Sequence, residues 1–203
     1  MQNTGFWWIL LAAAIYGAQH SLLASLGAKA LAQRWFGAAG KRYYRLFFVV
    51  VAVITTLPLA ALPLLLPDAR LYAIPMPWLI LTGLGQLAGL MVLAIGLMQT
   101  GMLPFLGLDV LFGQDKDLPP RMVTGGMYRW VRHPLYFGSL LIIWLLPVMT
   151  WNFLALNIGL TVYLAVGAWF EERKLLVEFS DAYRQYRQRT PMLFPIPFKR
   201  PSK

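Results

Sequence analysis

The sequence predicts an all-α, polytopic membrane protein, a helical bundle with about five transmembrane helices. Hydrophobic residues make up 59% of the 203 residues and charged residues 13%, whereas soluble domains average about 45–50% and about 25%. The mean hydropathy is +0.59. Several uncharged runs also reach the roughly 20 residues that a helix needs to cross a hydrocarbon core about 30 Å thick. Together these three observations exclude an ordinary soluble globule.

Three uncharged runs each predict one membrane-spanning helix. They extend from about Gly5 to Ser25, from Leu46 to Pro67 and from Trp78 to Thr100, and none of them contains Asp, Glu, Lys or Arg. The first run could be taken for a secretory signal. Such a peptide begins with basic residues, however, and residues 1–8 contain neither Lys nor Arg. We therefore expect this helix to be retained.

A fourth uncharged stretch, Pro134 to Phe170, is too long for one span and is interrupted at Pro147. We predict a tight helical hairpin of two spans, Leu135 to Met149 and Asn152 to Phe170. Both ends of such a hairpin return to the same face of the membrane. The residues just before it and just after it should therefore be neighbours.

The basic residues predict the orientation of the chain. There are 18 Lys and Arg against 8 Asp and Glu, a net charge of +10. Arg70 alone lies in the second loop, and the other seventeen lie in the first loop, the third loop and the tail after the hairpin. Because basic loops stay in the cytoplasm, we expect the N-terminus to lie outside, and the first loop, the third loop and the C-terminal tail to lie in the cytoplasm. The excess of charge thus predicts a lipid bilayer as partner and no nucleic acid.

Some features that imitate the motifs of soluble enzymes are interpreted as packing. The run Gly83 to Gly89 resembles part of a dinucleotide fingerprint, but no strand precedes it, and Gly85 and Gly89 favour close helix packing instead. His20, near the cytoplasmic end of the first span, is interpreted as a hydrogen-bonded boundary residue. The chain contains no Cys, which excludes disulfides and thiolate ligands, and no metal site is predicted.

The third loop ends in the sequence GMYRWVRHPLYFG, residues 126–138. Pro134 disfavours helical geometry at His133 and suits a first helical turn, so His133 should lie at a helix N-terminus. Such a terminus favours a carboxylate or phosphate, and its dipole should lower the pKa of the imidazole and keep the ring neutral. Tyr136 lies one turn further on and faces the same way. Taken alone, a basic pair such as Arg132 and His133 before a span is more often an interfacial anchor than a site.

The tail opens with two carboxylates, Glu171 and Glu172, directly after the apolar run. They are costly at the edge of a membrane unless Arg173, Lys174 or a ligand cation partners them. An amphipathic helix then follows, with spacings of four, three and four that place on one face Glu172, Leu176, Phe179 and Tyr183. Taken alone, this pattern fits an interfacial helix with solvated charges as well as a site.

Three motifs in this order resemble the isoprenylcysteine carboxyl methyltransferase family of integral membrane enzymes. They are Gly-x-Tyr-x-x-x-Arg-His-Pro-x-Tyr-x-Gly at 126–138, the two glutamates with the residues 179–186 that follow the hairpin, and Pro-Met-Leu-Phe-Pro at 191–195. The resemblance covers roughly residues 118–197. His20 to Ser25 and Tyr44-Arg45 resemble the bacterial NnrU branch and the methanethiol S-methyltransferases. The expected regions are therefore an NnrU-like three-span part, 1–100, and a methyltransferase part, 101–203.

The resemblance implies S-adenosylmethionine as the methyl donor, bound in a cytoplasmic pocket formed by the third loop and the amphipathic C-terminal helix. Carried over by motif position, the donor-binding residues are Pro120, Arg121, Met122, Val123, Tyr128, His133, Pro134, Leu135, Tyr136 and Glu171. Glu171 matches the family glutamate at the reaction centre, and His133 is the second catalytic candidate. The residues themselves agree with this, since a helix N-terminus suits the carboxylate of the donor and aromatic rings can face its sulfonium.

Two departures from the family pattern bear on the methyl acceptor. In the prenylcysteine enzymes an Arg one turn before the reaction-centre glutamate helps to hold the acceptor carboxylate, and Gly167 stands at that position here. Met192 likewise replaces an Arg in the closing motif. The resemblance thus favours a small or hydrophobic thiol such as methanethiol, deprotonated by Glu171 or by a neutral His133.

Three alternatives stay open at this point. One is a carboxyl methyltransferase acting on prenylcysteine or another lipophilic acceptor. The second is a membrane reductase that uses NADPH, since similar small helical bundles can host hydride chemistry. The third is a non-catalytic, NnrU-like membrane protein of nitrogen-oxide metabolism. Binding of S-adenosylhomocysteine, of NADPH or of neither nucleotide would separate the methyltransferases from the other two.

Overall fold

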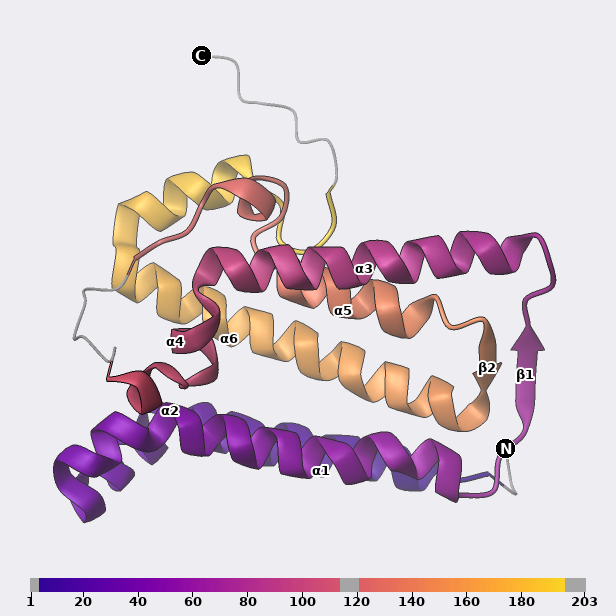
Figure 1. Ribbon diagram of the computed structural model, residues 1–203, viewed down its shortest axis with the longest axis horizontal. Coiled ribbons are helices and arrows are strands. Elements are labelled where there is room, and N and C mark those ends of the chain that lie inside the picture. Colours follow the sequence, from indigo (N-terminus) through magenta and orange to yellow (C-terminus); the bar gives the residue numbers. More distant parts are fainter. Residues whose placement is uncertain (1–3, 114–120, 196–203) are drawn as a thin grey trace. The chain divides into compact units, whose positions relative to one another are not determined.

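The computed structural model describes residues 4–113 and 121–195, and most of them are helical (Figure 1). The elements in chain order are α1 (Phe6–Ala24), α2 (Leu26–Leu65), β1 (Arg70–Ala73), α3 (Trp78–Thr100), α4 (Met102–Leu106), the 3₁₀ turns η1 (Asp109–Phe112) and η2 (Gly126–Arg129), α5 (Pro134–Trp144), β2 (Val148–Thr150) and α6 (Trp151–Arg189). Four of the helices, α1, α2, α3 and α6, are long and apolar enough to cross a membrane. The predicted all-α membrane class is confirmed.

The chain forms two compact units. Unit 1 contains α1, α2, β1, α4, η1, β2 and α6 as far as Tyr163, and unit 2 contains α3, η2, α5 and α6 from Leu164 onward. The core of unit 1 is formed by buried side chains of α1, α2 and α6, namely Phe6, Ile9, Ala13, Leu59, Ala155 and Leu156. The candidate site lies entirely in unit 2.

The helix α2 is much longer than the predicted span from Leu46 to Pro67. It begins at Leu26, where the hydroxyl of Ser25 accepts a hydrogen bond from the N–H of Ala28 at 3.1 Å, as an N-cap residue does. Its backbone leaves helical geometry once, at Gly37. The basic first loop predicted from the sequence is therefore largely helical.

The fifth predicted span, Leu135 to Met149, is shorter than expected. The helix α5 ends at Trp144 after eleven residues, which at 1.5 Å per residue gives about 16 Å. The residues that follow Pro147 form β2, which pairs antiparallel with β1 in unit 1. Four described helices thus have the length of a span and α5 is a shorter apolar helix, because proline and strand pairing end it early.

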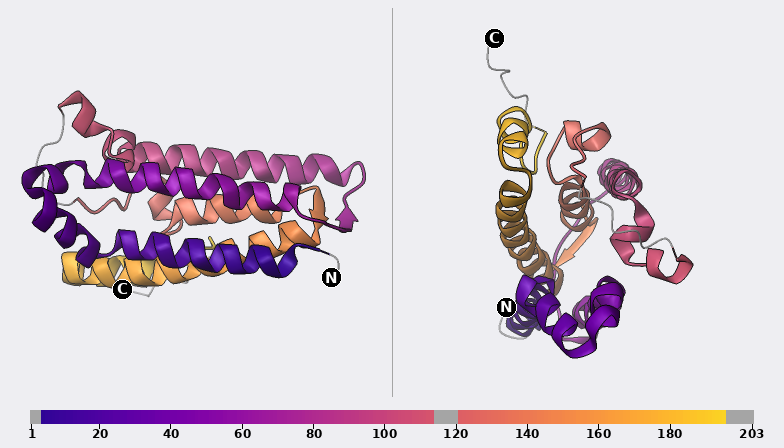
Figure 2. Two further views of the ribbon diagram at one scale, coloured as in Figure 1. Left: turned by 90° about the horizontal axis from the view of Figure 1, so that it is seen from below. Right: turned by 90° about the vertical axis from the view of Figure 1, so that its left-hand side faces the viewer.

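In unit 2, α3 and α5 run side by side (Figure 2). A Cβ placed on Gly89 would lie 2.9 Å from the carbonyl oxygen of Gly138, and one placed on Gly138 would lie 2.8 Å from that of Gly89. The two backbones are therefore in direct contact, which only glycine permits. The interpretation of Gly89 as a packing residue is confirmed.

The helix α6 continues 19 residues beyond Phe170, where its apolar stretch ends. It bends at Ser180, whose backbone has φ 46° and ψ −118°. Of the predicted inward face, Glu172 and Tyr183 are buried, while Leu176 and Phe179 are partly buried. The amphipathic tail predicted from the sequence is therefore present, with a bend that the spacing of its residues did not indicate.

Candidate functional site

The residues just before α5 lie against those just after the apolar stretch of α6, as the hairpin prediction required. His133 immediately precedes Pro134, the first residue of α5. Its Nε2 atom lies 3.0 Å from Oε1 of Glu172 and its Nδ1 atom 3.5 Å from Oε2 of Glu171. The imidazole is thus placed between two carboxylates.

His133 is buried, with 5% of its surface exposed. Burial lowers the pKa of the imidazole, but the hydrogen bonds and charges of Glu171 and Glu172 outweigh it and raise the pKa above its ordinary value of 6.5. The expectation that the helix dipole lowers this pKa was therefore wrong, because two full negative charges act more strongly than the partial charge at the end of a helix. When it is protonated, the ring can donate to both glutamates.

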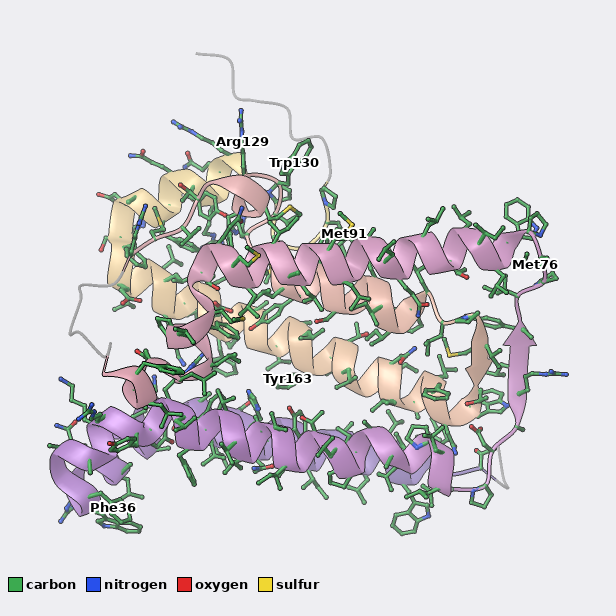
Figure 3. All side chains as sticks on the ribbon, in the orientation of Figure 1. Phe36, Met76, Met91, Arg129, Trp130 and Tyr163 are labelled. Atoms are coloured by element: carbon green, nitrogen blue, oxygen red, sulfur yellow. The ribbon has the colours of Figure 1, made fainter. Side chains whose placement is uncertain are left out.

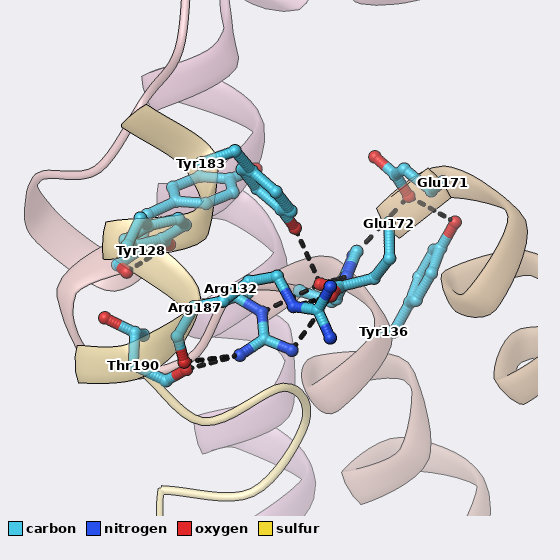
Figure 4. A network of polar contacts seen from close by, with 10 residues as sticks. Tyr128, Arg132, Tyr136, Glu171, Glu172, Tyr183, Arg187 and Thr190 are labelled. Atoms are coloured by element: carbon cyan, nitrogen blue, oxygen red, sulfur yellow. Dashed lines mark hydrogen bonds and ion pairs between the residues drawn. The ribbon is translucent and has the colours of Figure 1, made fainter. Parts of the chain in front are cut away.

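Glu171 is the carboxylate of the pair that a ligand can reach. Its side chain is 46% exposed, against 9% for Glu172. The hydroxyl of Tyr136 donates to Oε2 of Glu171 at 2.9 Å (Figure 4), so both contacts described for Glu171 use the same oxygen. The Tyr136 ring also stacks on His133, with centroids 5.3 Å apart and planes 6° apart. Tyr136 therefore faces the same way as His133, as predicted.

Glu172 is the centre of the polar network (Figure 4). Besides His133, it accepts hydrogen bonds from Nε of Arg132 at 2.7 Å, from Nη2 of Arg132 at 3.0 Å and from the hydroxyl of Tyr183 at 2.6 Å. The Nε atom of Arg187 lies 3.1 Å from its second oxygen. Glu172 follows the membrane-spanning part of α6. Its burial raises the pKa, but the donors lower it to about 2, so this carboxylate is ionised.

The closing motif is attached to the same segment through the main chain. The N–H groups of Arg132 and His133 donate to the carbonyl oxygens of Pro191 and Met192 at 2.9 and 3.1 Å. Nη1 of Arg132 also donates to the carbonyl oxygen of Thr190 at 2.6 Å. The three sequence motifs are therefore in direct contact in the folded chain.

The turn η2 lies between α3 and the end of α6. The carbonyl oxygen of Tyr128 accepts a hydrogen bond from the hydroxyl of Tyr186 at 2.5 Å, and the N–H of Met127 donates to Oε1 of Gln99 at 3.0 Å. Gly126 has φ +57°, and any side chain there would overlap the amide of Gln99. The motif therefore requires glycine at 126. Burial and the charge of Glu171 raise the pKa of Tyr128 to about 12.

The structure gathers some of the predicted residues and leaves others apart. His133, Tyr136 and Glu171 form one cluster. Pro134 and Leu135 pack against Gly96 of α3. Pro120 lies outside the described residues. The coil that leads into η2 contains Arg121, Met122 and Val123, and over 121–195 no described hydrogen bond joins these three to the cluster.

Sequence reasoning missed most of the network around Glu172. It places Glu172 and Tyr183 on one face of a helix, which is the available signal, but it names Arg173, Lys174 or a ligand cation as partners of the two glutamates. The partners that the structure gives Glu172 include Arg132 and Arg187 instead, which the sequence suggests only as an anchor and as a basic residue of the tail. Nothing in the sequence near Gln99 indicates its role, because its partner Met127 lies 28 residues away.

This arrangement offers one reachable carboxylate held in place by a phenol and an imidazole. An exposed carboxylate of this kind can face a cation or accept a proton. The neighbouring aromatic ring can face a sulfonium or ammonium group. Within residues 4–113 and 121–195 there is no cluster of three His, Asp or Glu side chains that could hold a metal ion.

Comparison with known proteins agrees with the motifs. The profile of the phospholipid methyltransferase family matches residues 80–181, a segment that contains α5, His133 and both glutamates. Methanethiol S-methyltransferase 1 of Bradyrhizobium diazoefficiens is 47% identical over 77 residues, which are 38% of this chain and 27% of that protein. Methanethiol S-methyltransferase of Mycobacterium tuberculosis is 45% identical over 73 residues, 36% of this chain and 30% of that protein.

A third relative is the protein-S-isoprenylcysteine O-methyltransferase of Schizosaccharomyces pombe, 35% identical over 80 residues, 37% of this chain and 33% of that protein. The chain thus spans about a third or less of the length of these relatives. No solved structure matches.

Proposed function

Because the chain belongs to the phospholipid methyltransferase family, we propose that it is an integral membrane methyltransferase that transfers a methyl group from S-adenosylmethionine to the sulfur of a small thiol. The family resemblance predicted from the three motifs is confirmed by this membership and by the named relatives. The observation that carries the proposed activity is the exposed Glu171 carboxylate, fixed by Tyr136 and next to the imidazole of His133.

The residues present suit the donor. When bound, S-adenosylmethionine supplies an electrophilic methyl group on a positively charged sulfur. Glu171 and the ring of Tyr136 would lie against that charge, since a carboxylate and an aromatic face both attract cations. We further propose that the backbone of 120–123, Tyr128 and the first turn of α5 from His133 to Tyr136 hold the remainder of the donor.

Glu171 is the better candidate for the base. A thiol with a pKa near 8.5 must lose its proton to react as a thiolate. The two carboxylates beside His133 raise the pKa of its imidazole and so favour the protonated form, which cannot accept another proton. Burial raises the pKa of the Glu171 carboxyl, but the hydrogen bond and charge of His133 and the hydrogen bond of Tyr136 lower it below its ordinary value. Glu171 would therefore accept the thiol proton as the sulfur attacks the methyl group, and alignment of the sulfur with the methyl group supplies most of the rate.

Gly167 supports a small acceptor without a carboxylate. It lies one helical turn before Glu171, and a Cβ placed on it would be 3.7 Å from the hydroxyl oxygen of Tyr136. A longer side chain at 167 would therefore reach toward the Tyr136–Glu171 pair. Glycine leaves that place open, and no basic group stands there to bind an acceptor carboxylate. The names of two relatives, methanethiol S-methyltransferases, agree with a small thiol.

We also propose that the protein lies in a bacterial inner membrane with its N-terminus outside and the site on the cytoplasmic side. The support is the distribution of Lys and Arg, seventeen of which fall on one predicted side. The residues of the site, Arg132, His133, Glu171 and Glu172, all belong to that side. The donor would then enter from the cytoplasm.

The test is a methylation assay with the full chain in detergent. Labelled donor is supplied with methanethiol, with a prenylcysteine or with no acceptor, and the volatile and lipid-soluble products are separated. We expect label in dimethyl sulfide, and a loss of roughly 100-fold or more in Glu171→Gln. Glu178→Gln, an exposed glutamate on the same helix, is the matched control and should keep the parent rate.

If label appears only in the prenylcysteine, the methyl acceptor is a carboxyl group and not a thiol. Calorimetry separates the other readings, because S-adenosylhomocysteine should bind and NADPH should not. A protein that binds neither nucleotide would contradict the proposed activity.

A further inference from the structure

The end of α6 contributes to an open depression in unit 2. Its volume is about 370 Å³, and it is lined by Arg132, Arg184, Arg187 and Gln188. This volume falls within the range of about 300–1,000 Å³ that small-molecule sites occupy. All four side chains can donate hydrogen bonds, and none of them is a carboxylate. The depression is therefore built for an acceptor group.

Two of the guanidinium groups are held in place. The Arg132 side chain is 9% exposed and is fixed by Glu172 and by the carbonyl oxygen of Thr190. Arg187 is 43% exposed, and the ion pair described for it uses Nε alone. Figure 4 shows both side chains approaching Glu172 together. The terminal nitrogens of Arg187 are thus available to a ligand on the open side.

The charges around the depression favour an anion. Three guanidinium groups line it, and the two carboxylates paired with them are Glu172 and Asp181. Asp181 lies 2.9 Å from Arg184, but their side chains are 81% and 69% exposed, so that pair is weak and easily exchanged. The net charge of the groups around the depression therefore remains positive. Arginine suits phosphate in particular, because its planar donors match the phosphate oxygens.

The surroundings point to a membrane surface as the source of the phosphate. Trp130 lies between Arg129 and Arg132 in the sequence and is 67% exposed, and Figure 3 shows Arg129 and Trp130 next to each other at the surface. Exposed tryptophan is typical of the lipid headgroup region, and basic residues beside it attract anionic lipids.

We propose that the depression lined by Arg132, Arg184, Arg187 and Gln188 binds the phosphate of an anionic phospholipid headgroup. The lipid is held by the protein and is not its methyl acceptor. The inference does not depend on the proposed methyl transfer. A soluble phosphate would satisfy the same donors, and the experiment has to separate the two sources.

The test uses the full chain in detergent and native mass spectrometry to count bound lipid. The probes are phosphatidylglycerol, which offers neither an amine nor a thiol to methylate, phosphatidylcholine, and inorganic phosphate. We expect phosphatidylglycerol to bind best and its affinity to fall roughly fivefold in Arg184→Gln, as expected for one basic residue near an anionic surface. Gln188→Leu removes a donor without changing the charge and should also weaken binding.

Arg189→Gln is the matched control. It makes the same change of charge in the same helical segment, but Arg189 does not line the depression. Binding should change less than twofold. Equal binding of phosphatidylglycerol by the parent, Arg184→Gln and Gln188→Leu would overturn the proposal. A different result would contradict the lipid as ligand. If inorganic phosphate binds as tightly as phosphatidylglycerol, and Arg184→Gln abolishes its binding, the site binds a soluble anion.

Discussion

Arg132 binds Glu172 through two parallel contacts, Nε to one carboxylate oxygen at 2.7 Å and Nη2 to the other at 3.0 Å. Only the planar guanidinium can bind in this way. Both side chains are 9% exposed, so water cannot replace a lost contact. This pair connects the loop before α5 to α6 and holds the imidazole of His133 between its two carboxylates.

Replacing Arg132 by lysine should therefore destabilise the protein. Lysine keeps the charge but loses one charge-assisted hydrogen bond, a cost of about 1.5–3 kcal/mol in the free energy of unfolding. Arg187→Lys is the control, because Arg187 contacts the same carboxylate through one atom and is half exposed. It should cost less than about 1 kcal/mol. Denaturant unfolding in detergent measures both, and equal losses would contradict the structural role of the pair.

The two adjacent glutamates should behave differently when made neutral. Glu172→Gln leaves Arg132 buried without its partner, so the free energy of unfolding should fall by about 3–5 kcal/mol. Glu171→Gln changes a half-exposed side chain and should cost less than about 1 kcal/mol, while methyl transfer is lost. Thermal unfolding of the two proteins, together with rates at a temperature where both are folded, checks this. A larger loss of stability in Glu171→Gln would reverse the roles assigned to them.

The raised pKa of His133 predicts a pH dependence above neutrality. The folded protein holds the imidazole proton more tightly than the unfolded chain does. This stabilisation is complete below pH 6.5 and is lost as the pH rises through the raised pKa. Denaturant titrations from pH 6 upward should show a decline that His133→Gln lacks. An imidazole NMR signal, assigned by its loss in His133→Gln, should titrate above 6.5, and titration at or below 6.5 would contradict the two-carboxylate environment.

Position 167 should control access to the reactive carboxylate. Gly167→Ala places a Cβ at an ordinary contact distance from Tyr136, so activity should stay near the parent value and the helix should gain up to about 1 kcal/mol. Gly167→Leu should fill the open place beside Tyr136 and reduce kcat/KM for the thiol by roughly tenfold or more. Calorimetry with S-adenosylhomocysteine should show unchanged donor affinity. An unchanged kcat/KM in Gly167→Leu would mean that the acceptor does not bind beside position 167.

Much of this arrangement could be predicted from the sequence, because strong local signals determine it. The proline after His133 set the start of α5, and the uncharged stretch from Pro134 to Phe170 indicated a hairpin that returns to one face. The spacing of Glu172 and Tyr183 identified the buried side of the tail. Each of these is a property of neighbouring residues.

The remainder depended on contacts between distant segments. The early end of α5 reflects the pairing of β2 with β1, about 75 residues earlier in the chain. The raised pKa of His133 depends on two carboxylates nearly 40 residues away, which a local helix argument could not include. The bend at Ser180 has no marker, since serine is not a residue that favours a positive φ.

The main-chain bonds from Arg132 and His133 to Pro191 and Met192 also bear on biosynthesis. A nascent chain emerges from the ribosome with its N-terminal part first. The helices that insert into the bilayer are therefore made before the carbonyl groups that complete the site. A polypeptide terminated by a nonsense codon at position 190 would still contain all the apolar helices that the structure describes. It would lack Pro191 and Met192, the main-chain partners of Arg132 and His133. Such a product would accumulate in the membrane without activity.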